Sequence, residues 1–149
     1  MIGAATILLV EDNEDDVFLM KRALKSAGIV NPLCVAEDGQ KAIDYLQGTG
    51  EFANRTTYPL PALIFLDLKL PFVRGLDVLA WLRRDDRFKT IIVVVLTSSE
   101  EPSDLSNAYK LGANSYLVKP PTPQQLEELA KAFKLYWLEY NKIPGVDQN

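Results

Sequence analysis

Residues with ligating or reactive side chains stand directly after four short apolar runs of the sequence: Glu11 and Asp12, Asp67, Thr97, and Lys119. Carboxylates that are crowded together repel one another and favour protonation unless a cation joins them. Mg²⁺ relieves this repulsion, because it binds through one or two carboxylates and keeps waters and phosphate oxygens as its other ligands. A lysine and a hydroxyl beside such a cation can clamp a phosphate, and an aspartate can be a nucleophile toward phosphorus. If the fold brings these groups together, they predict a site that puts a phosphoryl group on a carboxylate.

The apolar runs themselves have the pattern of parallel strands. Residues 7–10, 63–66 and 91–96 are apolar at every position, which is typical of strands covered on both faces by helices. Residues 33–36 and 115–118 are weaker runs and fit strands at the edges of the same sheet. The sequence therefore predicts a sheet of five strands.

Segments with apolar residues three and four positions apart alternate with these runs and predict five helices. The first of them ends at Gly28, a typical C-terminal cap. The last covers residues 123–141 and has the clearest start, with Thr122 as N-cap, Pro123 at the first helical position and Gln125 completing a capping box.

Strict alternation of strands and helices predicts an α/β fold, a flavodoxin-like doubly wound five-stranded parallel sheet with strand order 2-1-3-4-5 and five helices. A barrel would need eight such pairs. In an open sheet of this kind, ligands bind beyond the carboxyl ends of the strands, which is where the candidate residues stand. The long connection over residues 49–61 is rich in turn formers, and we expect it to hang over the surface.

Length and composition fit one soluble domain and exclude several classes of function. The 149 residues are 48% hydrophobic and 24% charged, as in ordinary globular proteins. The chain has no histidine, which excludes a Ser-His-Asp hydrolase and histidine-ligated zinc. A net charge of −4 without a basic stripe argues against direct nucleic-acid binding. No apolar run is long enough for a membrane span, and a lone Cys34 fits the reducing cytoplasm.

Four motifs, in the expected order and at the expected strand ends, resemble the signature positions of two-component response regulator receiver domains: VEDN at 10–13, LDLKLP at 66–71, LTS at 96–98 and YLVKP at 116–120. The resemblance covers about residues 6–141. It implies a single receiver domain over residues 1–149 with no output domain. Within the family, the chain looks most like the stand-alone response regulators of bacterial and cyanobacterial phytochromes, on account of the long connection at 49–61 and the aromatic segment at 136–138.

The resemblance implies a role for each candidate metal ligand. Asp67 would be the phosphoacceptor, and Asp67 and Asp12 would bind Mg²⁺, or another divalent cation such as Mn²⁺, together with the backbone carbonyl of Lys69. Glu11 stands where many receivers have aspartate, and would act mainly through a metal-bound water.

The resemblance also assigns the phosphoryl contacts and the switch. Thr97 and Lys119 would bind the phosphoryl oxygens, and Tyr116 would turn inward as Thr97 moves toward the phosphate. The peptide bond before Pro120 would be cis, and Ser99, like Lys69, would tune the lifetime of the phosphate.

The implied function is that of a single-domain response regulator in a phosphorelay. A sensor histidine kinase, in this subfamily a phytochrome, would phosphorylate it, and the product would switch protein contacts. The chain would be no enzyme beyond its own phosphorylation and dephosphorylation. A receiver-like interaction module that never takes phosphate is the main alternative. A haloacid dehalogenase-type phosphatase would need a second aspartate where Lys69 stands, and a nucleotide or flavin binder would need a phosphate loop after the first strand.

The last predicted helix carries a separate hypothesis. Its length is about 28 Å, against about 17 Å for a five-residue strand, so it must overhang the sheet. We expect a homodimer through the apolar residues of that helix, Phe133, Tyr136, Trp137 and Tyr140. Receivers commonly pair through this helix, so the resemblance points the same way. The alternative is that Phe133 and Trp137 pack on the sheet and the rest is tolerated surface.

Overall fold

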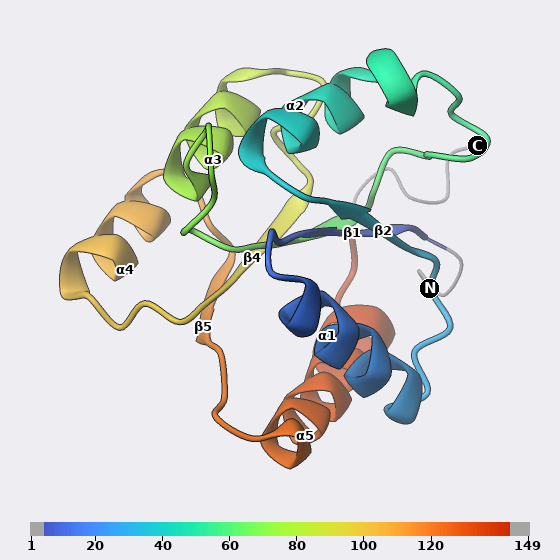
Figure 1. Ribbon diagram of the computed structural model, residues 1–149, viewed down its shortest axis with the longest axis vertical. Helices are drawn as coiled ribbons and strands as arrows, with labels where there is room; N and C mark the ends of the chain where they lie inside the picture. Colours follow the sequence, from blue (N-terminus) through green and yellow to red (C-terminus); the bar gives the residue numbers. More distant parts are fainter. Residues whose placement is uncertain (1–4, 144–149) are drawn as a thin grey trace.

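The computed structural model describes residues 5–143 (Figure 1). Its strands are β1 (Ile7–Val10), β2 (Leu33–Ala36), β3 (Leu63–Leu66), β4 (Ile92–Thr97) and β5 (Ser115–Val118). Its helices are α1 (Glu14–Ser26), α2 (Gly39–Gln47), the 3-10 turn η1 (Gly50–Phe52), α3 (Gly75–Arg84), α4 (Pro102–Lys110), α5 (Pro123–Phe133) and the π-helical segment η2 (Lys134–Tyr140). Within this range, every helix is too short or too polar to cross a membrane.

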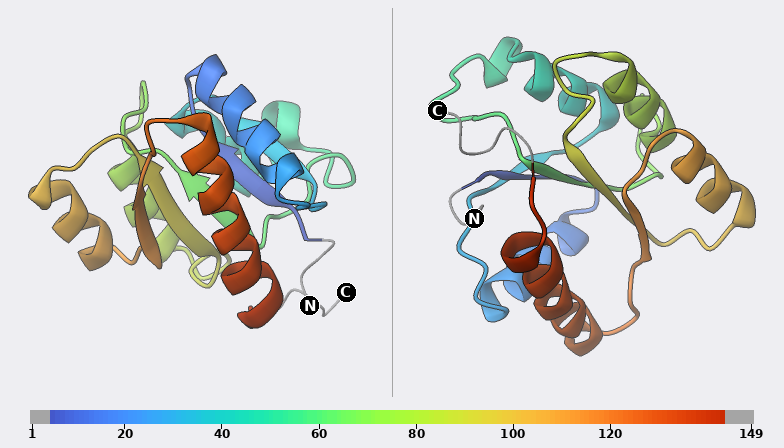
Figure 2. Two further views of the ribbon diagram at one scale, coloured as in Figure 1. Left: turned by 90° about the horizontal axis from the view of Figure 1, so that it is seen from below. Right: turned by 180° about the vertical axis from the view of Figure 1, so that it is seen from behind.

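The strands form one parallel sheet in the order β2-β1-β3-β4-β5, which confirms the predicted fold class. Helices α1 and α5 cover one face, and α2, α3 and α4 cover the other (Figures 1 and 2). Every residue of the three central strands is buried. Side chains alternate between the two layers, so Leu8 and Val10 pack toward α2 and α3 whereas Ile7 and Leu9 pack toward α1 and α5.

The ladder continues past the strand ends and fixes the backbone of the candidate residues. The backbone N–H of Glu11 donates to Ala36, that of Asp67 donates to Val10, and that of Lys119 donates to Thr97. The ends of β1, β3, β4 and β5 therefore lie along one edge, where the sequence placed the site.

The connection between α2 and β3 lies at the surface as predicted, with most of its residues exposed, but a few side chains anchor it. Phe52 is buried, and its ring lies 5.1 Å from the rings of both Tyr45 and Tyr58. The Arg55 guanidinium donates to the carbonyl oxygens of Tyr45 and Leu46 at 2.7 and 2.6 Å. These carbonyls lie in the last turn of α2, where carbonyls run out of partners within the helix, and the Tyr45 carbonyl also accepts the Gly48 N–H. The aromatic cluster and Arg55 together anchor the loop.

The C-terminal helix starts as predicted but changes its winding. The Thr122 hydroxyl accepts the N–H of Gln125 at 3.2 Å; the Gln125 side chain bonds the same hydroxyl rather than the backbone, so the capping box is only half formed. From Lys134 the helix is π-wound and ends at Tyr140, not Asn141. The buried residues of this helix are Ala130 and Phe133 in α5 and Leu138 in η2.

This winding changes the predicted dimer surface. Phe133 packs on Phe65 of the sheet, with ring centroids 4.7 Å apart, so its placement in an interface was wrong. Trp137 is half-buried. Tyr136 and Tyr140 are exposed, at 59% and 72%. The exposed apolar patch of η2 therefore consists of Leu135, Tyr136 and Tyr140.

Candidate phosphoryl-transfer site

The Lys119 ammonium is the centre of the site. Its Nζ lies 2.5 Å from Oε1 of Glu11, 2.9 Å from Oδ2 of Asp16 and 3.0 Å from Oδ2 of Asp67. Glu11, Asp67 and Lys119 are largely buried, whereas Asp16 is about half-buried. The fold thus gives all three ammonium hydrogens a carboxylate acceptor, from β1, α1 and β3.

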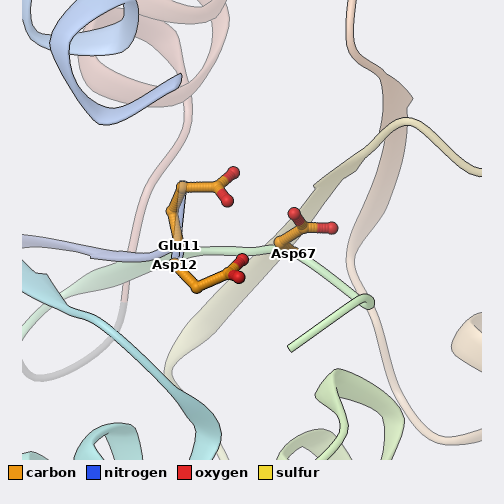
Figure 3. A group of neighbouring side chains, drawn as sticks. All are labelled: Glu11, Asp12 and Asp67. Carbon is orange, nitrogen blue, oxygen red and sulfur yellow. The ribbon is translucent and has the colours of Figure 1, made fainter. Parts of the chain in front are cut away.

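Glu11, Asp12 and Asp67 form a cluster of oxygen donors. One carboxylate oxygen from each lies within 4.8 Å of the others. Figure 3 shows the carboxylates of Glu11 and Asp12 extending from the end of β1 toward Asp67 at the end of β3. Oxygen ligands at this spacing suit a hard divalent cation, and the donor set therefore fits the cation that the sequence predicts.

The electrostatics of the site reflect three buried or half-buried carboxylates that share one ammonium. Burial raises the pKa of Glu11 to about 7, although hydrogen bonds from Lys119 and from the backbone of Asn13 act to lower it. Burial also acts to lower the pKa of Lys119, but its hydrogen bonds to Glu11 and Asp16 and the charge of Asp67 outweigh burial and raise the pKa. Lys119 therefore stays an ammonium, and ionised Glu11 needs more positive charge than Lys119 alone supplies.

Thr97 and Tyr116 are joined through Ser99. Thr97 is fully buried at the end of β4, and its Oγ1 accepts the Ser99 N–H at 3.4 Å. The Tyr116 hydroxyl donates to the Ser99 carbonyl at 3.0 Å, and the Ser99 hydroxyl donates to Asp104 of α4 at 2.5 Å. One short segment thus connects the predicted phosphoryl contact to the predicted switch residue and to α4.

Lys69 and the peptide bond before Pro120 are the remaining predicted features of the site. The backbone N–H of Lys69 donates to Oδ1 of Asp67 at 3.2 Å, while its side chain is exposed. The predicted cis bond before Pro120 was wrong, because every described peptide bond is trans. Trans is the lower-energy form by about 0.5–1 kcal/mol, and Lys119 reaches its three carboxylates with it.

Asp16 was not among the site residues predicted from the sequence. The acids of the first turn of α1 are Glu14, Asp15 and Asp16, which look like ordinary complements to the helix dipole. The feature of the sequence that could have identified Asp16 is its position close behind the first strand. Asp16 is three residues after the N-cap Asn13, whose side chain accepts its N–H, and so it stays close to the end of β1.

The chain is similar to proteins of one family. A family model described as a response regulator receiver domain matches residues 7–131. The chain is 41% identical over 139 residues to a probable methanogenesis regulatory protein, FilR2, of Methanothrix harundinacea, covering 93% of this chain and 87% of that protein. It is 38% identical over 139 residues to response regulator Rcp1 of Synechocystis sp., covering 93% of this chain and 92% of that protein.

Two solved structures are similar over nearly their whole length. The Mn²⁺-bound form of Rcp1 superposes with a TM-score of 0.85 at 38% identity, covering 94% of this chain and 99% of that chain. The phosphorylated cyanobacterial phytochrome response regulator RcpA superposes with a TM-score of 0.87 at 36% identity, covering 95% and 99%. One relative has thus been seen with a divalent cation and another in a phosphorylated form.

Proposed function

The chain belongs to the response regulator receiver family, and from that membership we propose that Asp67 accepts a phosphoryl group from the phosphohistidine of a sensor histidine kinase. The observation that carries this proposal is the meeting of Asp67, the Lys119 ammonium and two further carboxylates at one strand edge. An Asp67 oxygen forms a bond to phosphorus while the phosphorus–nitrogen bond of the kinase histidine breaks, and the imidazole nitrogen keeps the bonding electrons. The protein would catalyse only this step and the hydrolysis of its own aspartyl phosphate.

The residues around Asp67 divide the work of that transfer. Glu11, Asp12, Asp67 and the carbonyl of Lys69 would hold Mg²⁺, which supplies positive charge to the carboxylates and to the phosphoryl oxygens. Lys119 is within 3.0 Å of Asp67 and would follow the phosphoryl oxygens once they are attached there. Glu11 and Asp67 are buried, and water screens the interactions of their carboxylates less than it would at the surface.

Phosphorylation would be passed on through Thr97, Ser99 and Tyr116. When the Thr97 hydroxyl turns to a phosphoryl oxygen, the Ser99 N–H loses its geometry with that hydroxyl. The Ser99 carbonyl holds Tyr116, so a shift of Ser99 changes which state of Tyr116 and α4 is favoured. The output is a change in protein contacts. A receiver-like module that never takes phosphate is not favoured, because the sequence keeps Asp67, Thr97 and Lys119 together at the expected strand ends.

A phytochrome is the kind of sensor kinase we propose for this chain. Support comes from RcpA, which is described as a phytochrome response regulator and superposes over 95% of this chain. A net charge of −4 fits protein rather than nucleic-acid partners, and the cytoplasm is where we expect the pair to meet. The test is phosphotransfer from purified phytochrome kinases and from unrelated sensor kinases at equal concentration. Preferential transfer from the unrelated kinases would contradict the phytochrome assignment.

Cation binding should depend on pH through Glu11. Because the pKa of Glu11 is about 7, a cation must displace a proton from it below neutrality. The apparent affinity for Mg²⁺ should therefore fall by up to about tenfold for each pH unit below 7, and level off above about pH 8. Calorimetric titration over this range measures it. A Glu11→Gln variant should bind more weakly and lose most of this pH dependence; an unchanged profile in that variant would show that Glu11 is not the titrating ligand.

We also propose a homodimer through η2, with Tyr136 and Tyr140 at its centre. The two tyrosines are exposed, whereas Leu138 of the same segment is buried. A Tyr136→Arg/Tyr140→Arg double variant should give a monomer mass in light scattering, because two facing copies would then bring four cations together. Phe18→Arg, an equally exposed aromatic position on α1, is the matched control. A double variant that keeps the wild-type dimer mass, or a monomeric wild type, would refute this interface.

Incubation with acetyl phosphate and Mg²⁺ tests the proposed chemistry without any kinase. Intact mass spectrometry should show one added phosphoryl group on the wild type, and a chelator added beforehand should prevent it. No uptake from acetyl phosphate or from any kinase tested would favour the interaction module instead.

A further inference from the structure

Asp16 has a contact that the receiver motifs do not assign. Its carboxylate lies 2.9 Å from the Lys119 ammonium, yet it is not part of the cluster formed by Glu11, Asp12 and Asp67. We propose that Asp16 is a positioning residue that holds Lys119 in place for phosphoryl transfer. This inference rests on the proposed function of Asp67.

The first turn of α1 aims Asp16 at Lys119. The Asn13 side chain accepts the Asp16 N–H at 2.9 Å, and the Asn13 carbonyl accepts the Val17 N–H, so the backbone of this turn is fixed at its start. Glu14 and Asp15, its neighbours, are exposed, whereas Asp16 is half-buried. The three acids of the turn therefore differ in exposure, and Asp16 is the one whose carboxylate contacts Lys119.

Lys119 needs an anchor because its surroundings leave it room to move. A cavity of about 80 Å³ lies between α1 and the segment after β5. Glu11, Asp16 and Thr122 line it beside Lys119, and the other walls include the apolar side chains of Leu19, Met20 and Leu126. A lysine side chain in such a space has several rotamers available. Apolar walls offer the ammonium no hydrogen-bond acceptor, so they favour no one position for it.

Asp16 is the acceptor that Lys119 can keep throughout the reaction. Glu11 and Asp67 have a second duty, since both belong to the carboxylate cluster that fits a cation, and Asp67 also receives the phosphoryl group. Asp16 has neither duty. An ammonium with one bond to Asp16 is directed toward Asp67 before and after transfer, and it retains two hydrogens for phosphoryl oxygens.

The test compares Asp16→Ala with Asp15→Ala, which removes the same charge from the same helical turn without touching Lys119. With acetyl phosphate and saturating Mg²⁺, phosphoryl uptake should slow by about tenfold or more in Asp16→Ala and change by less than about twofold in Asp15→Ala. Asp16→Glu should restore part of the rate, because a carboxylate again faces the ammonium. Thermal melts of all variants establish that each is folded.

A second readout is independent of phosphorylation. In the metal-free protein, the ¹⁵N resonance of the Lys119 ammonium should be observable by NMR, since hydrogen bonds to three carboxylates slow its hydrogen exchange. It should broaden beyond detection in Asp16→Ala and persist in Asp15→Ala. Equal behaviour of the two variants in both experiments would overturn the inference, as would faster uptake in Asp16→Ala. A wild type that takes no phosphate refutes the proposed function instead, and the ammonium resonance still decides whether Asp16 holds Lys119.

Discussion

Replacing Asp67 with asparagine should abolish phosphoryl uptake and leave the fold intact. The amide has nearly the same shape as the carboxylate. It keeps an oxygen that can accept the hydrogen bond from the Lys69 N–H, which Oδ1 of Asp67 accepts at 3.2 Å in the wild type. It is no longer a nucleophile toward phosphorus, because its oxygen carries no full negative charge. The loss of one carboxylate also relieves repulsion from Glu11, which is among the interactions that raise the pKa of Glu11.

The matched control for Asp67→Asn is Asp86→Asn. Asp86→Asn makes the same chemical change at an exposed aspartate whose ion pair is with Lys89, and it should take up phosphate like the wild type. Intact mass after incubation with acetyl phosphate and Mg²⁺ measures all three proteins. Uptake by Asp67→Asn at the wild-type rate would show that another residue is the phosphoacceptor.

Gly75→Ala should damage both stability and phosphorylation. Gly75 begins α3, and a Cβ there would stand 2.2 Å from the carbonyl oxygen of Asp67 and 2.6 Å from Cα of Leu68. Both neighbours are backbone atoms, so the segment after β3 must shift to make room. We expect a loss of about 3 kcal/mol in the free energy of unfolding. Because the same shift moves Asp67, uptake should slow by about 100-fold.

Gly50→Ala separates a backbone clash from the loss of a glycine. A Cβ at Gly50 meets nothing within 4 Å, although its φ of +61° is unfavourable for alanine. This variant should lose about 1 kcal/mol of stability and phosphorylate normally. Urea unfolding and uptake rates check both variants. If Gly75→Ala is as active and as stable as Gly50→Ala, α3 does not hold Asp67 in the way that the structure indicates.

The fold was predictable because its strongest signals are local. Residues 7–10 and 63–66 are apolar at each position, and the observed β1 and β3 have the same bounds. Parallel pairing then fixes where Glu11 and Asp67 lie, since a residue that follows a strand must lie at its carboxyl end. The meeting of these carboxylates with Lys119 followed from strand order alone.

The features that the sequence did not predict depend on contacts between distant residues. Arg55 and Phe52 anchor the loop after α2 by contacts with the carbonyl and the ring of Tyr45, and no local sequence pattern indicates these contacts. The π winding after Phe133 accompanies the burial of Leu138 against residues of distant elements, which the local spacing of apolar residues does not show. Asp16 looked like any acid at a helix start until the reach of Lys119 was known.

The most direct test of the central claim is to locate the phosphoryl group chemically. Borohydride reduces an aspartyl phosphate to homoserine, and peptide mass spectrometry then identifies the altered residue. After incubation of the wild type with acetyl phosphate and Mg²⁺, we predict homoserine at position 67 and at no other aspartate. Homoserine at Asp12 or Asp16, or phosphate retained on a hydroxyl such as that of Ser99, would contradict the assignment of Asp67 as the phosphoacceptor.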